Sequence, residues 1–364
     1  MSAVRTRRVR LSSSRWMRTA GGLSALWLIA SAVAAAEVSR TAGTASESPA
    51  QRWISPAAAR SIELGLGWLA SRQNDDGSFG AGPYQGNTGV VGLCGLAFLA
   101  SGSTPGRGPY GRQIDRCVDY LLSRTQQGGY ISAAEYAGHG PMYGHGFAVL
   151  FLAEAYGMSA RDDLRDKLSA AVRLIIDSQN KEGGWRYYPQ RADADISVTV
   201  CQVMALRAAR NAGLFVPNET IDRSIDYVKR CQNADGGFRY MLDGDGESAL
   251  ARSAAALTAL NSAGIYEGPE LRSGVEFVMS FRPGGGRTTR DPSYYEYAHY
   301  YAAQAMWQMG DETFDRWFVA ARDDVLARQR PDGSWPSGFG AEYATAMCLL
   351  VLQLPNQALP IFQR

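Results

Sequence analysis

The chain has 364 residues, of which 46% are hydrophobic and 20% are charged, and its formal net charge at pH 7 is +2. Beyond the first 36 residues it has no basic stripe or cluster of lysines and arginines, which excludes nucleic acid as a partner. Its five cysteines are an odd number with no Cys-x-x-Cys spacing, which argues against a disulfide framework in a fold of this size.

The first 36 residues have the layout of a secretory signal peptide. Six arginines give a basic start, and the small, apolar run Gly21–Ala36 ends in three alanines that offer a cleavage site. This run is shorter than the ~20 residues that a membrane span needs. We therefore expect export to the periplasm or the cell exterior, with an uncleaved, membrane-associated anchor as the alternative. Removal of 1–36 changes the net charge from +2 to −4. Residues 37–53 are predicted to form a flexible leader.

Four segments share the pattern Gln-x-x-x-Gly-x-aromatic. They begin at Gln73, Gln179, Gln232 and Gln329. A shorter form occupies residues 126–130, and a glycine-rich patch at 284–286 stands where a further copy is expected. A spacing of about fifty residues, kept over most of the chain, predicts a repeat architecture.

Each motif lies between two predicted helices. The helix before it is amphipathic, because apolar residues stand 17 and 10 positions before the motif aromatic, as Ile62 and Leu69 do in the first copy. The helix after it is rich in Ala, Ser and Gly with large apolar residues interspersed, which is typical of burial on more than one side. These inner helices are predicted at Val90–Ala100, Gly146–Tyr156, Ile196–Asn211, Ala249–Ala263, Ala298–Met309 and Tyr343–Leu354.

Six such hairpins predict an all-α fold of twelve helices over residues 54–355, followed by a short C-terminal tail, 356–364. An open stack of repeats needs polar capping repeats at its ends. Here the first and last repeats are as apolar as the middle ones. This pattern favours closure into a single (α/α)6 toroid.

The Gln-x-x-x-Gly-x-Trp copies resemble the QW motif of squalene and oxidosqualene cyclases. The Gly-Gly-Trp and Gly-Gly-Phe segments are similar to the repeat shared by squalene cyclases and protein prenyltransferases. The resemblance covers roughly residues 54–355 and implies a toroid whose inner helices surround a cavity. In this superfamily the motif glutamine ties down a helix end and stacks on the aromatic ring, so the resemblance implies a structural role for the motif.

The loops that lead into the inner helices gather at one mouth of such a ring, which is the expected place for a site. Asp193-Ala194-Asp195 precedes the third inner helix and is similar to the Asp-x-Asp-Asp acid motif of class II terpene cyclases. The resemblance implies that Asp195 is a proton donor and Asp193 its neighbour, although Ile196 replaces the last aspartate. The structural alternative is that Asp195 caps the helix and Asp193 interacts favourably with its dipole.

Polar residues at matching positions of the inner helices form a second candidate set. His145, Cys201 and Arg252 each stand 12 residues before the glycine that follows the helix, and His299 stands 11 before it. This register predicts one layer inside the ring. The segment Tyr295–Tyr300 loosely resembles the histidine segment of the zinc-binding prenyltransferases, but their Asp-x-Cys partner is missing. We therefore predict no zinc and no other cofactor, and the alternative role of these residues is to line the barrel.

Aromatic side chains are dense in the same loops. Rings with polar edges suit a pocket for an isoprenoid, a sugar or a carbocation, and they equally suit loop packing. The predicted ligand-binding residues, together with Arg252, are Tyr143, Trp185, Tyr187, Tyr188, Tyr240, Tyr294, Tyr295 and Trp335.

Two functional hypotheses follow from these observations. The first is an exported, terpenoid-cyclase-like protein that cyclises or binds an isoprenoid or another apolar small molecule, with prenyltransferase-like chemistry as its second form. Its candidate catalytic residues are Asp195, Asp193, His299 and His145. The second is a non-catalytic periplasmic or cell-surface module that binds a lipid, a glycan or a protein at the toroid mouth.

Overall fold

The computed structural model describes residues 52–133, 140–159, 161–243, 246–284, 286–287 and 294–363. The chain divides into two units, Met1–Ser46 and Glu47–Arg364, and the fold described below belongs to the second. The predicted signal peptide and all but the last two residues of the predicted leader lie outside the described residues. Within the described part, no helix has the length and apolar character required to span a bilayer.

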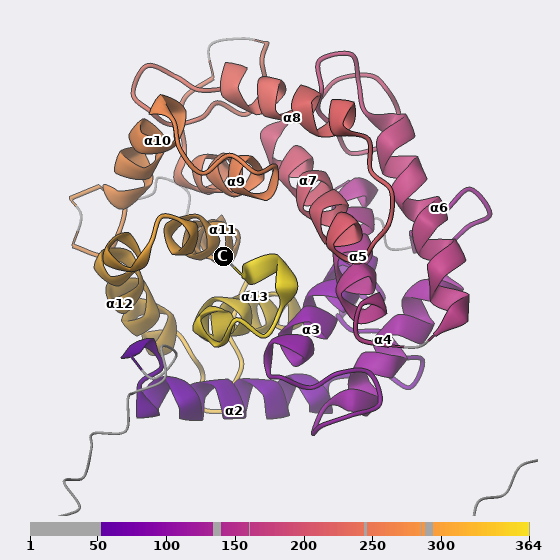
Figure 1. Ribbon diagram of the computed structural model, residues 1–364. Helices are drawn as coiled ribbons and strands as arrows, with labels where there is room; N and C mark the ends of the chain where they lie inside the picture. Colours follow the sequence, from indigo (N-terminus) through magenta and orange to yellow (C-terminus); the bar gives the residue numbers. More distant parts are fainter. Residues whose placement is uncertain are drawn as a thin grey trace, which may run out of the picture. The chain divides into compact units, whose positions relative to one another are not determined.

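The helices of the described residues alternate between an outer and an inner ring (Figure 1). The outer helices are α2 (Pro56–Ser71), α4 (Gly111–Ser123), α6 (Asp162–Ser178), α8 (Asn218–Arg230), α10 (Pro269–Met279) and α12 (Asp311–Ala327). The inner helices are α3 (Thr88–Ala100), α5 (Pro141–Tyr156), α7 (Ile196–Asn211), α9 (Leu250–Ser262), α11 (Tyr295–Gln308) and α13 (Ala341–Gln353). The prediction of an all-α toroid of six helical hairpins is confirmed.

The two rings differ in burial as their sequences predict. Every residue of α3 is buried, because it packs against α5 and α13 on its sides and α4 behind it. Helix α4 buries one face only, which carries Ile114, Val118 and Leu121, and exposes the other. The inner helix predicted to start at Gly146 begins at Pro141 instead, because Pro141 occupies the first helical turn, where a missing N–H costs nothing.

The glutamine motif joins each repeat to the next one. The Gln179 side-chain amide donates to the carbonyl of Gly183 in its own turn (2.8 Å) and to that of Thr220 at the start of α8 (2.9 Å). Gly183 has a φ of +102°, and a Cβ at this position would lie 2.1 Å from the Arg223 carbonyl oxygen. Only glycine therefore allows the turn to approach α8 this closely.

The same contact closes the ring. The Gln329 amide donates to the carbonyl of Gly333 (2.9 Å) and to that of Ser61 on α2 (2.9 Å), so the last repeat is bonded to the first as neighbours are bonded to each other. The inner ring is also continuous, because α13 packs against α3. This closure explains why neither terminal repeat needs a polar cap.

The C-terminal tail packs on the toroid. After α13 the chain forms two short 3-10 helices, η4 (Leu354–Asn356) and η5 (Pro360–Phe362). Leu359 and Phe362 are buried, and η5 contacts α7. In Figure 1 the chain ends inside the ring of inner helices. We call this end of the ring the tail mouth. The opposite end, where the inner helices begin, is the motif mouth, and the 3-10 helix η1 (Gly82–Tyr84) lies in its first loop.

Candidate functional site

Asp195 lies at the motif mouth as the N-cap of α7. Its Oδ1 accepts a hydrogen bond from the Val198 backbone N–H at 2.8 Å, which is the capping role that the sequence left open. Its own N–H donates to the Trp185 carbonyl at 3.0 Å. The side chain has no exposed surface, and Oδ2 has no hydrogen-bond partner at normal distance and angle. Capping therefore accounts for one carboxyl oxygen, and the other faces the Arg186 guanidinium.

Burial raises the pKa of Asp195 to about 6. The Val198 N–H, the Arg186 guanidinium and the Tyr240 hydroxyl offset part of this increase, because each favours the carboxylate. Arg186 Nε lies 3.6 Å from Asp195 Oδ2, while its Nη1 pairs with Asp193 Oδ2 at 2.9 Å. Asp193 is exposed, so the two acids of the predicted pair have different surroundings.

Sequence reasoning missed Arg186. A signal was available, because Arg186 follows the motif tryptophan directly and Arg239 follows the phenylalanine of the next copy. The backbone bridge between Trp185 and Asp195 then places Arg186 beside the acid motif.

Three of the predicted ligand-binding tyrosines gather near Asp195. The hydroxyl groups of Tyr187 and Tyr240 are hydrogen-bonded at 2.6 Å, and the Arg186 guanidinium lies 4.8 Å and 5.6 Å from the centres of their rings. The Tyr143 ring lies 6.2 Å from that of Tyr187. A buried acid, a cation and three phenol rings therefore meet where the loops and the first turns of inner helices of neighbouring repeats come together.

Further tyrosines fill the ring behind Asp195. Tyr297 donates from its hydroxyl to the Ser197 carbonyl across the ring (3.0 Å), and its ring packs on that of Tyr301 at 4.6 Å. Cys201 lies 3.3 Å from the Tyr301 hydroxyl, and burial raises the pKa of its thiol to about 12. This interior is packed and its thiol is protonated, so Cys201 is not a nucleophile at neutral pH.

A second aromatic group lies on other loops of the motif mouth. The ring of Phe339 lies within 6.1 Å of those of Tyr84, Tyr294 and Tyr343. Beside it, Glu296 is buried, its pKa is raised by burial, and it accepts a hydrogen bond from Ser337 at 3.3 Å. Tyr294 was predicted as a ligand-binding residue, whereas Phe339 was not, because it lies outside every motif of the sequence.

His145 has a structural explanation. Its Nδ1 accepts from the Ile131 N–H (3.1 Å), its Nε2 faces the Ala171 carbonyl on α6 (3.2 Å), and burial lowers its pKa to about 4. In three other repeats a hydroxyl group accepts in the same way from the N–H of the motif aromatic, the place that Ile131, which follows Tyr130, takes in the shortened copy. These are Thr199 for Trp185, Ser253 for Phe238 and Thr345 for Trp335.

The predicted single layer of inner-helix residues is not formed. His145 points to α6, and His299 packs against Trp317 of α12, whereas Cys201 faces Tyr301 across the ring. The reason is helical geometry. His145 corresponds in its contact to Thr199 and Ser253, which lie two positions before Cys201 and one position after Arg252, and each position turns a side chain by about 100° around the helix axis. Neither histidine is placed with Asp195 by these contacts.

The two motif tryptophans are held between the rings of helices. Each is almost fully buried, and their indole N–H groups donate at 2.7 Å to the carbonyls of Ile175 and Val325 on the preceding outer helices. Although Trp185 and Trp335 were predicted to bind a ligand, these contacts are those of the structural role that the motif resemblance implies.

The other predicted ligand-binding residues are dispersed. Tyr188 is exposed, and Tyr295 donates to Asp324 on α12. Arg252 is half-buried at the start of α9, its Nε has no hydrogen-bond partner, and burial lowers its pKa. Within the described ranges no three His, Cys, Asp or Glu side chains are arranged to hold a metal ion.

Comparisons with known proteins agree with this fold. The family model of the prenyltransferase alpha-alpha toroid domain matches residues 53–147 and 126–289. No curated protein matches the sequence.

Solved structures with the same fold include a variant of the type II terpene cyclase MstE from Scytonema in complex with the product merosterolic acid A. It is 16% identical with a TM-score of 0.59, over 82% of this chain and 97% of that one. A second variant, with the substrate geranylgeranyl dihydroxybenzoate, is 17% identical with a TM-score of 0.58, over 84% and 98%. An inactive alpha-1,6-mannanase variant from Salegentibacter with bound mannotetrose is 9% identical with a TM-score of 0.60, over 82% and 99%. At these identities the likeness shows the fold alone.

Proposed function

Since the chain belongs to the prenyltransferase alpha-alpha toroid domain family, we propose that its motif mouth binds an isoprenoid or a similar apolar ligand and that Asp195 protonates it to start a cyclisation. The resemblance of Asp193-Ala194-Asp195 to the acid motif of class II terpene cyclases led to this proposal. The terpene cyclases among the solved structures with this fold are consistent with it.

The observation that carries the proposal is the state of the Asp195 carboxyl group. Protonation of a carbon–carbon double bond needs a neutral acid that faces an apolar ligand, and burial keeps a large fraction of Asp195 protonated below pH 6. Because Oδ1 is occupied by the Val198 N–H, the proton resides on Oδ2. Arg186 lies 3.6 Å from Oδ2, where its charge stabilises the carboxylate once the proton has left.

The proposed step balances without a cofactor. The Oδ2–H bond of Asp195 breaks, the π electrons of the alkene form a new C–H bond, and the adjacent carbon becomes a cation. A second double bond of the ligand attacks this cation and closes a ring. The sequence ends when a carbon-bound proton is lost or water adds to the last cation, and Asp195 regains a proton from solvent. The rings of Tyr143, Tyr187 and Tyr240 offer π faces to the developing positive charge.

We also propose that this activity takes place outside the cytoplasm, because residues 1–36 have the layout of a signal peptide.

The test is turnover of polyprene substrates by the purified protein, followed by mass spectrometry of the products. Asp195→Asn is the decisive variant, because an amide oxygen keeps the cap on Val198 while the acid is lost. We expect its rate to fall by about 100-fold or more. The matched control is Asp193→Asn, which removes an exposed carboxylate on the same loop and is expected to keep most of the activity.

Equal turnover by Asp195→Asn and the unmodified protein would rule out Asp195 as the acid. If the unmodified protein turns over no polyprene, cyclisation is wrong and the non-catalytic binding module takes its place. Analysis of the lipids and glycans that co-purify with the protein would then identify what the motif mouth holds.

A further inference from the structure

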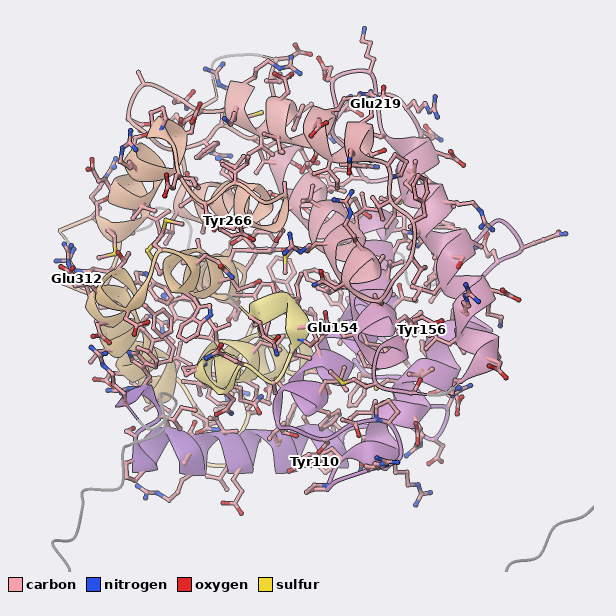
Figure 2. The ribbon with its side chains drawn as sticks, viewed as in Figure 1. Tyr110, Glu154, Tyr156, Glu219, Tyr266 and Glu312 are labelled. Carbon is pink, nitrogen blue, oxygen red and sulfur yellow. The ribbon has the colours of Figure 1, made fainter. Side chains whose placement is uncertain are left out.

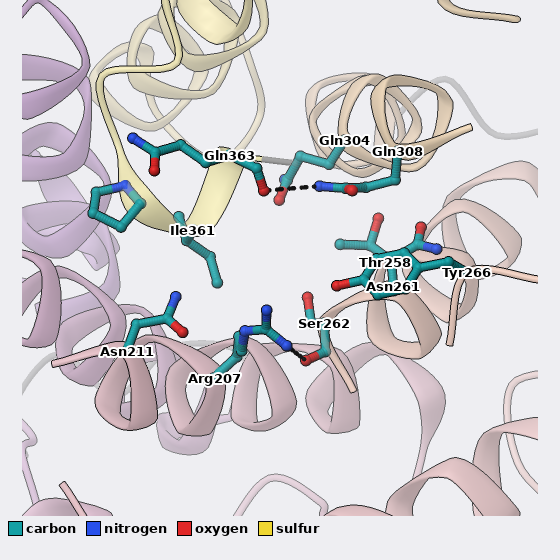
Figure 3. A pocket seen from close by; sticks show the side chains of 11 residues that line it. Arg207, Asn211, Thr258, Asn261, Ser262, Tyr266, Gln304, Gln308, Ile361 and Gln363 are labelled. Atoms are coloured by element: carbon teal, nitrogen blue, oxygen red, sulfur yellow. Dashed lines mark hydrogen bonds between the residues drawn. The ribbon is translucent and has the colours of Figure 1, made fainter. Parts of the chain in front are cut away.

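A pocket lies at the tail mouth, away from the proposed acid. It is formed by the C-terminal ends of α7, α9 and α11 together with the tail, and its cavity is about 30 Å³ (Figure 3). Asp195 caps the start of α7 and Arg207 lies in its C-terminal half, twelve positions later, which corresponds to about 18 Å along the helix. The lining residues are Arg207, Asn211, Thr258, Asn261, Ser262, Tyr266, Gln304, Gln308, Pro360, Ile361 and Gln363.

Hydrogen-bond acceptors are available in the pocket wall. Asn261 is only 4% exposed, and its side-chain N–H donates to the Ile265 carbonyl at 3.0 Å, which fixes its amide orientation. Its Oδ1 is buried without a partner. Gln304 is also buried and uses its N–H for the Tyr300 carbonyl (3.0 Å), so its amide oxygen is the group left for a ligand. Such acceptors are costly when they stay unpaired.

The pocket also offers donors. Among the described residues, Arg207 is the one charged residue that lines it, and its Nη1 makes a long hydrogen bond of 3.4 Å to the Ser262 carbonyl (Figure 3). A guanidinium has five N–H donors, so most of them remain free. An anion would be attracted by Arg207 but repelled by the amide oxygens of Asn261 and Gln304. An ammonium group would be repelled by Arg207. Neutral hydroxyl groups, which donate and accept, match both kinds of partner.

We propose that this pocket binds one end of a neutral polyhydroxyl ligand, such as a sugar residue. The cavity has room for roughly two water-sized groups, which corresponds to two hydroxyl groups of the ligand. Tyr266 is 47% exposed at the pocket, and its ring gives a flat surface for the remainder of a sugar. The tail completes the wall, because Gln308 donates to the Gln363 carbonyl at 3.4 Å.

The test uses the full chain and direct binding measurements, with glucose, mannose and glycerol as probes and with inorganic phosphate and acetate as anionic competitors. We expect one of the sugars to bind with a Kd of about a millimolar, the usual range for so few contacts. Arg207→Met and Asn261→Ala each remove one side of the pocket and should weaken binding roughly tenfold. Arg210→Met is the matched control, because Arg210 lies on the same helix but binds the Val216 carbonyl and Asn218.

Any of three results would overturn the proposal. The first is binding of phosphate or acetate, lost in Arg207→Met, without any binding of the three hydroxylated probes. The second is that no probe binds. The third is that a sugar binds equally well to Arg207→Met and to the unmodified protein. Since Arg207 is only half-buried, Arg207→Met gives a readable result even if Asn261→Ala fails to fold. Asp195→Asn should leave the sugar affinity unchanged, which keeps this test separate from that of the proposed cyclisation.

Discussion

Glu154 should make the protein less stable as the pH rises. It lies on α5 toward the inside of the ring, whereas Glu219 and Glu312 point outward at the periphery (Figure 2). Burial raises its pKa from 4.5 to about 8, although one oxygen accepts the backbone N–H of Ile361 in the tail. Its Oε2 has no hydrogen-bond partner. The folded protein therefore holds the proton of Glu154 more tightly than the unfolded chain does.

The magnitude and sign follow from this difference. Below pH 4.5 both states are protonated and Glu154 has no effect on stability. Between pH 4.5 and 8 the unfolded chain loses the proton first, so the free energy of unfolding falls as the pH rises and levels off above pH 8. A difference of about 3.5 units corresponds to a loss of about 5 kcal/mol.

The assay is denaturant unfolding at pH 5, 7 and 9 for the unmodified protein, Glu154→Gln and Glu219→Gln. Glutamine can accept the Ile361 N–H but does not titrate, so Glu154→Gln should become the more stable protein as the pH rises. The exposed Glu219→Gln should follow the unmodified protein at every pH. Parallel pH profiles for Glu154→Gln and the unmodified protein would refute the reasoning.

Three further predictions concern the motif, the acid and the buried histidine. Gln329→Leu removes the two hydrogen bonds with Ser61 that close the ring and the bond to the Gly333 carbonyl, so denaturant unfolding should show a loss of about 2–4 kcal/mol. Gln363→Leu at the exposed tail should change little. Folding raises the pKa of Asp195 from 3.8 to about 6, so the unmodified protein should lose about 3 kcal/mol of stability between pH 3.5 and a pH above 6, a loss that Asp195→Asn lacks. Measured against the unmodified protein, the variant should therefore gain about 3 kcal/mol over this range, and the absence of this gain in the same unfolding series would contradict the buried, partly protonated state. His145 is held neutral, with a pKa lowered from 6.5 to about 4, so the free energy of unfolding should fall by about 3 kcal/mol as the pH drops from 6.5 to 4; a thermal unfolding series with His145→Gln, which keeps an acceptor and a donor, should lack this dependence.

The fold could be predicted because the motif encodes local geometry in every repeat. Gln179 and Gly183 specify a turn that can approach the next outer helix, and the sequence repeats this motif at a spacing of about fifty residues. The hydrogen bond from Gln329 to Ser61 closes the ring because the last motif binds the first outer helix in the same way. The docking of Leu359 and Phe362 on the tail mouth was not predicted, because the apolar residues of a nine-residue tail are too few to show a period.

The candidate site was only partly predictable, since it combines residues from several repeats. The acid pair was located by its pattern, but its pairing with Arg186 depends on the backbone bridge between Trp185 and Asp195. The group around Phe339 draws on loops that are far apart in the sequence, and no periodicity relates them. Counting from the terminal glycine gave His145 the wrong register, because an error of one or two residues moves a side chain to another face of the helix.

The N-caps of two inner helices, Asn87 of α3 and Asp195 of α7, differ in chemistry. Asn87 is the N-cap of α3, the inner helix of the first repeat, and its Oδ1 accepts from the N–H groups of Gly89 (2.9 Å) and Val90 (3.2 Å). A neutral amide therefore suffices to cap an inner helix of this toroid. An acid at the corresponding place on α7 adds the cost of burying an ionisable group, visible in its raised pKa. This cost points to a role of the Asp195 carboxyl group beyond helix capping. The ion pair with Arg186 supplies one such role, and the proposed transfer of the Oδ2 proton to a ligand at the motif mouth supplies another.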